Sequence, residues 1–197
     1  MARERKFTTT ELYQATENLL LEQGYDAFTF SLLADRMSVS RGVLYKYYEN
    51  KDELISDYMI HEMERFLLQM NEIGERVGFM EQFDFLLQLI FKQVHIPQII
   101  DISHRVFVSQ DQKVQEQKAR LDAQRLEMYA RLHDFIQLGK HEGYLKRQIP
   151  DSVLLGFIFQ SFIIPNHFKI EQALWIQSIK DVLQTGVMQA PIQQDTD

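Results

Sequence analysis

One short helix that the sequence predicts carries side chains able to read a nucleic acid. Ser40 is a favoured N-cap residue, and it predicts a helix that begins at Arg41 and runs to about Tyr48. Arg41 and Lys46 can both donate hydrogen bonds to the acceptor atoms of guanine or to nearby phosphates. A helix of this size and polarity fits the major groove of DNA. These residues are therefore candidates for contacts to double-stranded DNA, and an ordinary surface helix is the alternative.

Residues beside this helix can contact the phosphate backbone. Gly42 lets the start of the helix come close to the DNA, and Tyr47 can bond a phosphate or pack on a base methyl group. Asn50 is placed to cap the following helix, whose first turn holds Lys51. The helix dipole opposes a positive charge in a first turn, so a bound phosphate would explain Lys51. The alternative is an ordinary surface helix with solvated charges.

Two further helices are needed to position these side chains. A threonine among residues 8–10 can cap a helix that runs to about Gln23, and Gly24 is expected to end it. Thr29 is placed to cap a second helix, and residues 37–40 are predicted to form the turn before the third. Together the three helices would form a helix-turn-helix unit.

The register of these positions resembles the helix-turn-helix of the TetR family of bacterial repressors. The resemblance covers about residues 8–55, and beyond them it rests on length, helix content and the segment 142–151. It implies that Thr29 and Lys51 hold phosphates at two helix N-termini and that Tyr45 lies near the DNA backbone. The matching positions are Gly24, Tyr25, Thr29, Leu33, Ala34, Val39, Ser40, Gly42, Leu44, Tyr45, Tyr48, Lys51 and Leu54.

Three positions depart from the family pattern. Ser38 stands where glycine is usual and follows Met37 instead of alanine, so Ser38 must tolerate a left-handed or strained backbone. Val43 stands where a hydroxyl residue is common, which removes one possible contact to DNA. The operator therefore does not transfer from a relative. The predicted DNA-binding residues are Thr29, Ser40, Arg41, Gly42, Val43, Tyr45, Lys46, Tyr47 and Lys51.

The charge distribution is compatible with DNA binding at one end of the chain. The net charge is −7, but residues 1–51 hold seven basic and seven acidic side chains, so the excess lies in residues 52–197. The chain has no cysteine, which excludes disulfides and thiolate metal sites. Its N-terminus lacks the apolar run of a signal peptide, and the apolar stretch 153–165 is too short to span a bilayer. We expect a cytoplasmic protein without a membrane partner.

The apolar pattern predicts an all-α fold with two domains. Residues 1–51 form the expected three-helix helix-turn-helix DNA-binding domain. Residues 52–188 form a larger helical domain for effector binding and dimerisation, and residues 189–197 a disordered tail. Helices are expected over residues 52–72, 80–95, from Pro97 to about 108, 112–141, 151–164 and 170–188.

The last two predicted helices indicate a homodimer interface. Residues 153–164 are apolar almost all round, so this helix needs burial on nearly every side. The two helices can pair with a two-fold copy as a four-helix bundle, which the TetR resemblance also implies, and such a dimer predicts a near-palindromic operator. The alternative is that both helices bury against their own chain. The predicted interface residues are Val153, Phe157, Phe162, Leu174, Trp175, Ile179, Val182 and Leu183.

An effector pocket within residues 80–180 is implied mainly by the resemblance. Large apolar side chains are frequent there, and a few histidines could supply polar contacts to a small molecule. For any one of these residues, the alternative is a solid core. The predicted pocket residues are Phe83, Leu87, Phe91, His95, His104, Phe107, Tyr129, His133 and Phe159.

The motifs in the rest of the sequence favour a regulator over an enzyme. The segment 61–65 begins like a zinc-protease motif but lacks its second histidine, and there is no Gly-rich phosphate loop or nucleophile elbow. We expect no catalytic residue, metal or cofactor. The prediction is a ligand-responsive, sequence-specific repressor, released from a palindromic operator by a small apolar or amphipathic effector. The alternative is a helical small-molecule or protein-binding module that no longer reads DNA.

Overall fold

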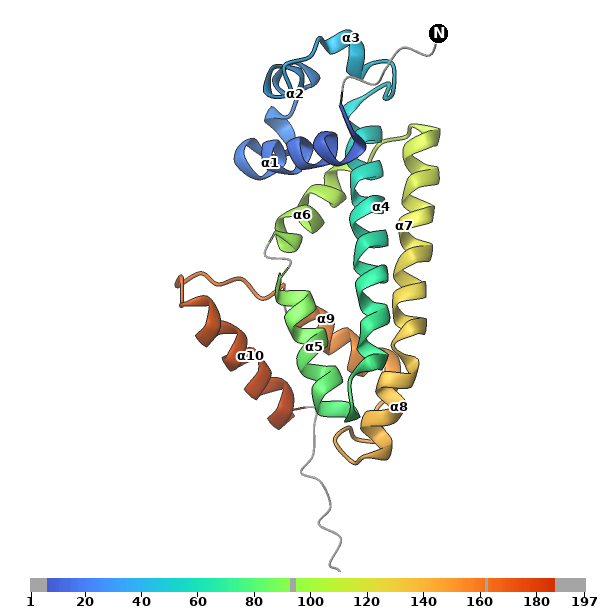
Figure 1. The fold of residues 1–197 in the computed structure, drawn as a ribbon, viewed down its shortest axis with the longest axis vertical. Coiled ribbons are helices and arrows are strands. Elements are labelled where there is room, and N and C mark those ends of the chain that lie inside the picture. Colours follow the sequence, from blue (N-terminus) through green and yellow to red (C-terminus); the bar gives the residue numbers. More distant parts are fainter. Residues whose placement is uncertain (1–6, 93–94, 162, 187–197) are drawn as a thin grey trace, which may run out of the picture. The chain divides into compact units, whose positions relative to one another are not determined.

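The structure is a computed structural model that describes residues 7–92, 95–161 and 163–186. The regular elements in these ranges are helices, which confirms the predicted all-α class (Figure 1). They form two compact units, residues 7–64 with 95–124, and residues 65–92 with 125–161 and 163–186. This packing does not test the boundary predicted after residue 51, which stays a prediction, and the predicted tail 189–197 lies outside the described residues.

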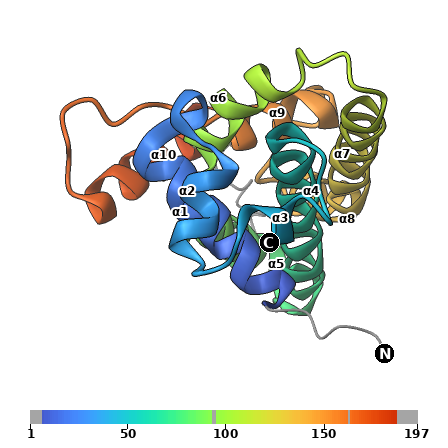
Figure 2. The same cartoon turned by 90° about the horizontal axis from the view of Figure 1, so that it is seen from above.

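The first unit contains the predicted helix-turn-helix. In Figure 2, α1 lies with α2 and α3, and contacts join α1 to α2 and α2 to α3. α6 also packs against α1, and the first part of α7 completes the unit. The bounds are α1 (Thr9–Ala27), α2 (Phe30–Arg36), α3 (Arg41–Leu44), α4 (Lys51–Met70), α6 (Ile96–Val106) and α7 (Gln112–Arg131).

Helix α1 begins and breaks where the sequence predicts. Thr8 is the N-cap, and its hydroxyl accepts a hydrogen bond from the Glu11 N–H at 3.1 Å while the Glu11 carboxylate accepts from the Thr8 N–H. Gly24 interrupts the helix with φ 75° and ψ 174°, a conformation that glycine adopts without strain. The next residue, Tyr25, therefore leaves the direction of the helix.

The turn before α3 follows the prediction, but α3 is shorter than predicted. Ser38 has φ 53°, the left-handed conformation expected there. α3 ends at Leu44, and the chain then tightens, with the Tyr47 N–H donating to the Leu44 carbonyl at 2.9 Å. The helix predicted to reach Tyr48 therefore ends about one turn earlier, and the side chain of Tyr48 after this turn is buried.

The apolar core of the first unit lies beneath these helices. Leu33, Ala34 and Leu44 are buried, and α4 supplies Leu54, Ile55, Tyr58 and Ile60 to the same cluster. Burial of such side chains stabilises each by about 1.5–3 kcal/mol. The segment from α3 to Tyr48, which we call the recognition region, is therefore packed on α4.

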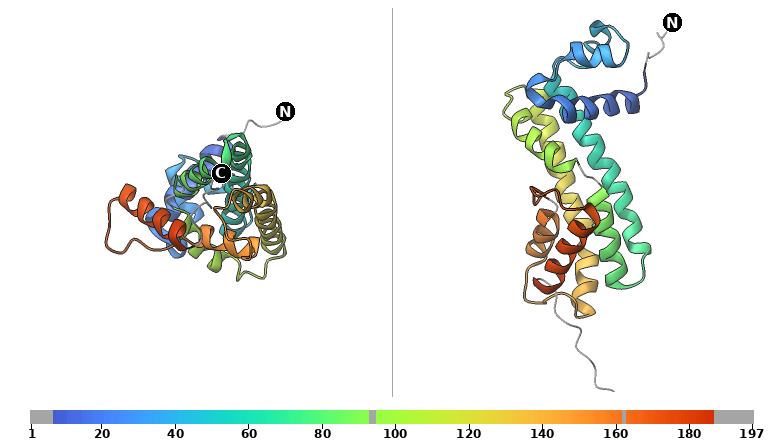
Figure 3. Two further views of the ribbon diagram at one scale, coloured as in Figure 1. Left: turned by 90° about the horizontal axis from the view of Figure 1, so that it is seen from below. Right: turned by 90° about the vertical axis from the view of Figure 1, so that its left-hand side faces the viewer.

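The second unit packs around one aromatic stack. The ring of Phe79 lies against those of Phe83, Phe135 and Tyr144, with centroids 5.8, 4.9 and 5.6 Å apart. Figure 3 shows α9 and α10 side by side in this unit, and the two helices are in contact. The remaining elements are η1 (Asn71–Glu75), α5 (Gly78–Lys92), α8 (His133–His141), α9 (Asp151–Ser161) and α10 (Gln172–Gly186).

Two helices predicted from the sequence have different bounds in the structure. The helix predicted over residues 112–141 divides at Leu132, although no proline or glycine marks the break. The helix predicted over residues 151–164 is α9, which ends at Ser161. Phe157 on it is 59% exposed within this chain, so its expected burial on nearly every side requires a partner and stays a prediction. Among the described residues, no helix combines the length and apolar character that crossing a membrane requires.

Gly139 tests the packing of the aromatic stack. A Cβ atom at this position would lie 2.6 Å from the Phe79 ring and 2.7 Å from the Leu145 side chain. We expect Gly139→Ala to lower the free energy of unfolding by about 1–3 kcal/mol because the core is overpacked. Denaturant unfolding measures this loss. Gly74→Ala is the control, since nothing lies within 4 Å of a Cβ there, and equal stability of the two variants would contradict the packing.

Candidate nucleic-acid interface

The predicted recognition residues lie mostly on the surface of the first unit. Arg41, Gly42 and Lys46 are exposed, and Tyr45 is 57% exposed. Val43 differs, because its side chain is half-buried and packs against the core of this unit. The exposed residues are therefore the part of the predicted set that a major groove can reach directly.

Two tyrosine rings of this surface are held by aromatic contacts. The Tyr45 ring meets the Phe30 ring edge-on, with centroids 5.0 Å apart, and the Tyr47 ring meets Phe7 in the same way at 5.8 Å. Such pairs add about 0.5–1.5 kcal/mol beyond area burial. Both rings can therefore be presented at the surface with little loss of side-chain entropy on binding.

Arg41 and Thr29 are arranged so that donors remain for a ligand. The Arg41 Nη1 donates to the Ser31 hydroxyl at 3.4 Å, a long bond that uses one of five guanidinium donors. The Thr29 hydroxyl accepts from the Leu32 N–H at 3.2 Å and caps α2, as predicted. Its hydroxyl hydrogen is the donor that a phosphate would use. Ser40 is extended before α3, but its side chain makes no cap hydrogen bond.

Lys51 makes intramolecular contacts that the sequence did not predict. Its Nζ donates to the Tyr25 carbonyl oxygen at 2.8 Å and lies 4.0 Å from the centroid of the Tyr25 ring. The Tyr25 hydroxyl in turn donates to Asp52 Oδ1 at 2.8 Å. Burial of the Tyr25 side chain is the largest cause, and the hydrogen bond to Asp52 the next, of the rise in the pKa of Tyr25 to about 12. The phenol therefore remains a donor at neutral pH.

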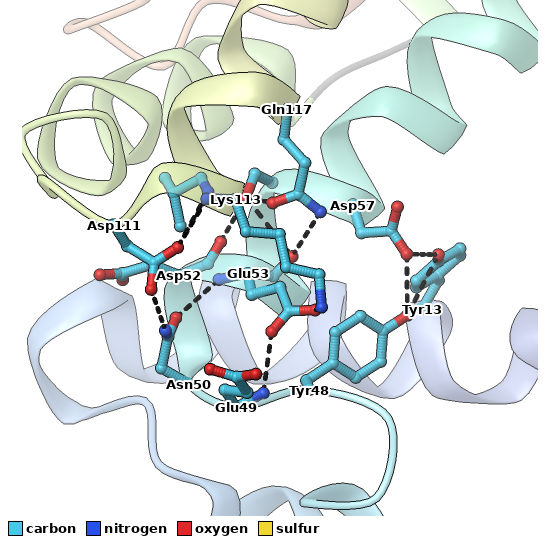
Figure 4. Close-up of polar contacts among 12 residues, drawn as sticks. Tyr13, Tyr48, Glu49, Asn50, Asp52, Glu53, Asp57, Asp111, Lys113 and Gln117 are labelled. Atoms are coloured by element: carbon cyan, nitrogen blue, oxygen red, sulfur yellow. Dashed lines mark hydrogen bonds and ion pairs between the residues drawn. The ribbon is translucent and has the colours of Figure 1, made fainter.

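The start of α4 is joined to the start of α7 through their caps (Figure 4). Asn50 caps α4 by accepting the Glu53 N–H at 2.9 Å, as predicted. Asp111 caps α7 by accepting the N–H groups of Lys113 and Val114 at 2.9 and 3.2 Å. The Asn50 Nδ2 donates to Asp111 Oδ2 at 3.3 Å, so one cap bonds directly to the other.

A buried carboxylate stands at the centre of this contact. Glu53 is only 2% exposed, its Oε2 accepts the Glu49 N–H at 2.8 Å, and its Oε1 pairs with Lys113 on α7. The hydrogen bond to Glu53 raises the pKa of Lys113. Gln117 donates to the Glu53 carbonyl at 3.2 Å and accepts from the Ser56 hydroxyl at 2.7 Å. A buried charge is tolerated only when paired in this way.

A second carboxylate, that of Asp57 on α4, joins α4 to α1 and to the end of the recognition region through hydrogen bonds. Asp57 Oδ2 accepts hydrogen bonds from Tyr13 at 2.7 Å and from Tyr48 at 2.9 Å (Figure 4). Burial raises the pKa of Tyr48, so its hydroxyl stays a donor. Tyr48 appears in the sequence only as a motif position, and nothing in the sequence points to Asp57 as its partner.

The predicted pocket residues are divided between the two units. His95, His104 and Phe107 belong to the first unit, and the other six belong to the second. His95, His104 and His133 are exposed. In the second unit, the rings of Tyr129 and Phe159 lie 5.9 Å apart, and Phe83, Leu87 and Phe159 are buried.

A groove of about 480 Å³ lies elsewhere, between the end of α1 and α6 in the first unit. Its apolar wall includes Leu20 and Ile102, and its rim carries Asp26, Asp101 and Arg105. Arg105 forms an ion pair with Asp26 across this rim. None of the nine predicted pocket residues lines this groove.

The predicted interface residues fall into two groups. Val153 and Phe157 on α9, with Leu174 and Val182 on α10, are exposed large apolar side chains. Ile179 and Leu183 instead face the interior of their own unit, where both are buried, and Trp175 is half-buried. Phe162 lies outside the described residues. The neighbouring helices α9 and α10 thus each expose large apolar side chains within this chain.

Comparison with known proteins identifies relatives of the helix-turn-helix part of the chain. Residues 12–58 match the bacterial regulatory proteins of the tetR family. The uncharacterized HTH-type transcriptional regulator YdeS of Bacillus subtilis (strain 168) is 40% identical over 50 residues, which make up 25% of this chain and 25% of that protein. The aligned part is therefore about a quarter of that relative's own length.

Two solved structures share the fold over most of this chain. A bacterial regulatory protein in the tetR family from Rhodococcus RHA1 is 13% identical, with a TM-score of 0.72 over 93% of this chain and 100% of that one. The transcriptional regulator FadR from Bacillus subtilis, in complex with stearoyl-CoA, is 16% identical, with a TM-score of 0.69 over 91% and 100%. At these identities the likeness establishes the fold alone.

Two ion pairs between α4 and α7 test the anchoring role of the buried carboxylate. Lys113→Ala leaves Glu53 buried without its cation, and we expect the free energy of unfolding to fall by about 1–2 kcal/mol. Arg120→Ala is the matched control, because its partner Glu64 is 43% exposed at a distance of 2.5 Å, and the loss should stay below about 1 kcal/mol. Urea unfolding of both variants measures the difference, and equal losses would contradict it.

Proposed function

Because the chain belongs to the tetR family of bacterial regulatory proteins, we propose that it is a homodimeric repressor released from its operator by a small molecule. The exposed surface of α3 and the turn after it, with Arg41, Tyr45 and Lys46, is the observation that carries the proposal. Residues 1–51 would bind DNA, and residues 52–188 would dimerise and bind the effector. Its site of action would be the cytoplasm, where the operator is.

Contacts to DNA divide between base edges and backbone. Arg41 and Lys46 would donate to base acceptors in the major groove, while Tyr45 and Tyr47 pack or bond at its edge. Thr29 at the start of α2 and Lys51 at the start of α4 flank α3, and these helix N-termini suit phosphates. Ser40 and Gly42 would let the start of α3 approach the backbone.

The apolar face of α9 and α10 supports a two-fold dimer. Val153, Phe157, Leu174 and Val182 are exposed on neighbouring helices, whereas Ile179 and Leu183 already pack within their own chain. An isologous interface would pair this face with its copy. The two recognition helices would then need a separation of about 34–36 Å, one turn of DNA, to read a near-palindromic operator.

Aromatic side chains of the second unit support a small apolar or amphipathic effector. Phe66 and Tyr129 both meet the Phe159 ring edge-on. Gln69, one turn after Phe66 on α4, has a buried Oε1 with no hydrogen-bond partner among the described residues. Such an atom would gain a bond from a ligand donor. FadR of Bacillus subtilis was solved with stearoyl-CoA, a ligand of this amphipathic kind.

Release from DNA would follow from differential affinity for two conformations. α4 carries the recognition region on its first turns and belongs to the second unit at its other end. An effector that prefers a different spacing of the two recognition helices shifts the population away from DNA, by no more than its preference allows.

Selection of duplexes from a random DNA pool at moderate salt tests the proposal. An enriched near-palindrome is expected for a dimer that reads sequence. Failure of a folded dimer to enrich any sequence would contradict the proposal and favour a binding module that does not read DNA.

Arg41→Ala tests direct reading of bases. If Arg41 donates to a guanine, the variant should lose about 1–3 kcal/mol of discrimination at particular base pairs of the selected operator. Fluorescence anisotropy with single-base operator variants measures this loss. Arg120→Ala, an exposed arginine on α7, is the control and should keep wild-type discrimination. A uniform loss over all sequences for Arg41→Ala would instead mark a phosphate contact.

Phe157→Glu tests the dimer face. A carboxylate at this exposed position on α9 would be buried without a partner in the proposed interface, so we expect the chain to become monomeric. Sedimentation at micromolar concentration measures the mass. Leu126→Glu is the control, because Leu126 on α7 is also an exposed large apolar side chain, 72% against 59% for Phe157, and lies outside the proposed face. A Phe157→Glu variant that stays dimeric would remove α9 from the interface.

A further inference from the structure

The ammonium group of Lys51 is held in a place that its helix disfavours. Lys51 is the first residue of α4, where the helix dipole presents partial positive charge. A free lysine at this position would extend into solvent. Here the side chain is half-buried, and its Nζ donates to the Tyr25 carbonyl at 2.8 Å. Another part of the chain therefore offsets the dipole.

Tyr25 supplies two attractions to the same nitrogen. Besides its carbonyl, its ring face lies 4.0 Å from Lys51 Nζ, within the range of a cation–π interaction. The kink at Gly24, with φ 75°, turns Tyr25 away from the direction of the first part of α1. An ammonium group has three donors; the carbonyl takes one and the ring face can take a second, which leaves a donor for a phosphate.

The same tyrosine also forms a hydrogen bond with the acid next to Lys51. Asp52 is the nearest carboxylate in the sequence, and one of its oxygens, Oδ1, accepts the Tyr25 hydroxyl at 2.8 Å. Its negative charge suits the start of α4, where the dipole stabilises it. The lysine is thus oriented by the carbonyl and ring of Tyr25 while the adjacent acid is bonded to the hydroxyl of that residue.

We propose that Tyr25 is a positioning residue for a DNA backbone contact made by Lys51. Its carbonyl and ring fix the ammonium group at the start of α4, so the cation is already in place when a phosphate arrives. The inference rests on the proposed function, because it assumes that this end of α4 meets DNA. Preorganisation of this kind removes the entropy cost of ordering a long side chain on binding.

A set of variants of the full chain separates positioning from packing. Affinity for the selected operator is measured over a series of salt concentrations. Lys51→Ala should reduce the slope of log K against log salt by about one, because one phosphate contact is lost. Tyr25→Leu keeps a carbonyl but loses the ring, and should weaken binding about two- to fivefold. Tyr25→Phe keeps both and should stay near the wild-type affinity.

The double variant Tyr25→Leu with Lys51→Ala provides the decisive comparison. If Tyr25 acts through Lys51, the double variant binds no more weakly than Lys51→Ala alone. Additive losses would mean that Tyr25 acts by packing only. Tighter binding by Tyr25→Leu would mean that the tyrosine withholds the lysine from DNA. Either result overturns the inference.

If Tyr25→Leu does not fold, an aromatic ring of nearly the same shape at position 25 provides a second test. Trifluorinated phenylalanine at position 25 keeps the packing of phenylalanine but reduces the negative charge of the ring face. We expect weaker binding than for Tyr25→Phe at an equal thermal unfolding midpoint. Equal binding by these two forms removes the inference while the wild-type chain still binds its operator. Absence of operator binding by the wild-type chain would instead remove the proposed function, and this inference with it.

Discussion

The ion pair between Glu53 and Lys113 is the contact on which the helix-turn-helix part of the chain depends. A carboxylate that is 2% exposed is costly unless a cation and hydrogen bonds meet it. Here the Glu49 N–H and Lys113 meet the carboxylate, while Gln117 bonds the backbone carbonyl of Glu53. The first turns of α4 can therefore be buried among α1, the recognition region and α7 without leaving an uncompensated charge.

The exposed and buried groups of this region have complementary roles. The residues proposed to meet DNA, such as Arg41 and Lys46, lie at the surface, and the hydrogen bond from Arg41 to Ser31 is long, so this contact can be exchanged at small cost. The groups that hold this surface in place, Asp57 with its two tyrosines and the caps at Asn50 and Asp111, lie beneath it. A rigid support under adaptable donors is the arrangement that preorganised recognition requires.

Local sequence rules predicted the helix order and the first two caps, because Thr8 and Thr29 act on residues three positions away. They also predicted the left-handed Ser38. They could not predict that Lys51 contacts Tyr25, since that contact joins residues 26 positions apart. The same limit applies to Phe157, because an apolar helix does not reveal whether its own chain or a partner covers it. Tertiary partners, unlike caps, leave no local pattern.

The bond between the caps of α4 and α7 joins residues 61 positions apart, which has a consequence for synthesis on the ribosome. At about 5–20 residues per second, α7 emerges roughly 3–12 s after the start of α4. Until then Glu53 has no cation and Asn50 no partner on α7. A nascent chain that ends before Asp111 therefore has the recognition helices but not their support. The helix-turn-helix part would reach its native stability only after more than half of the chain has been translated.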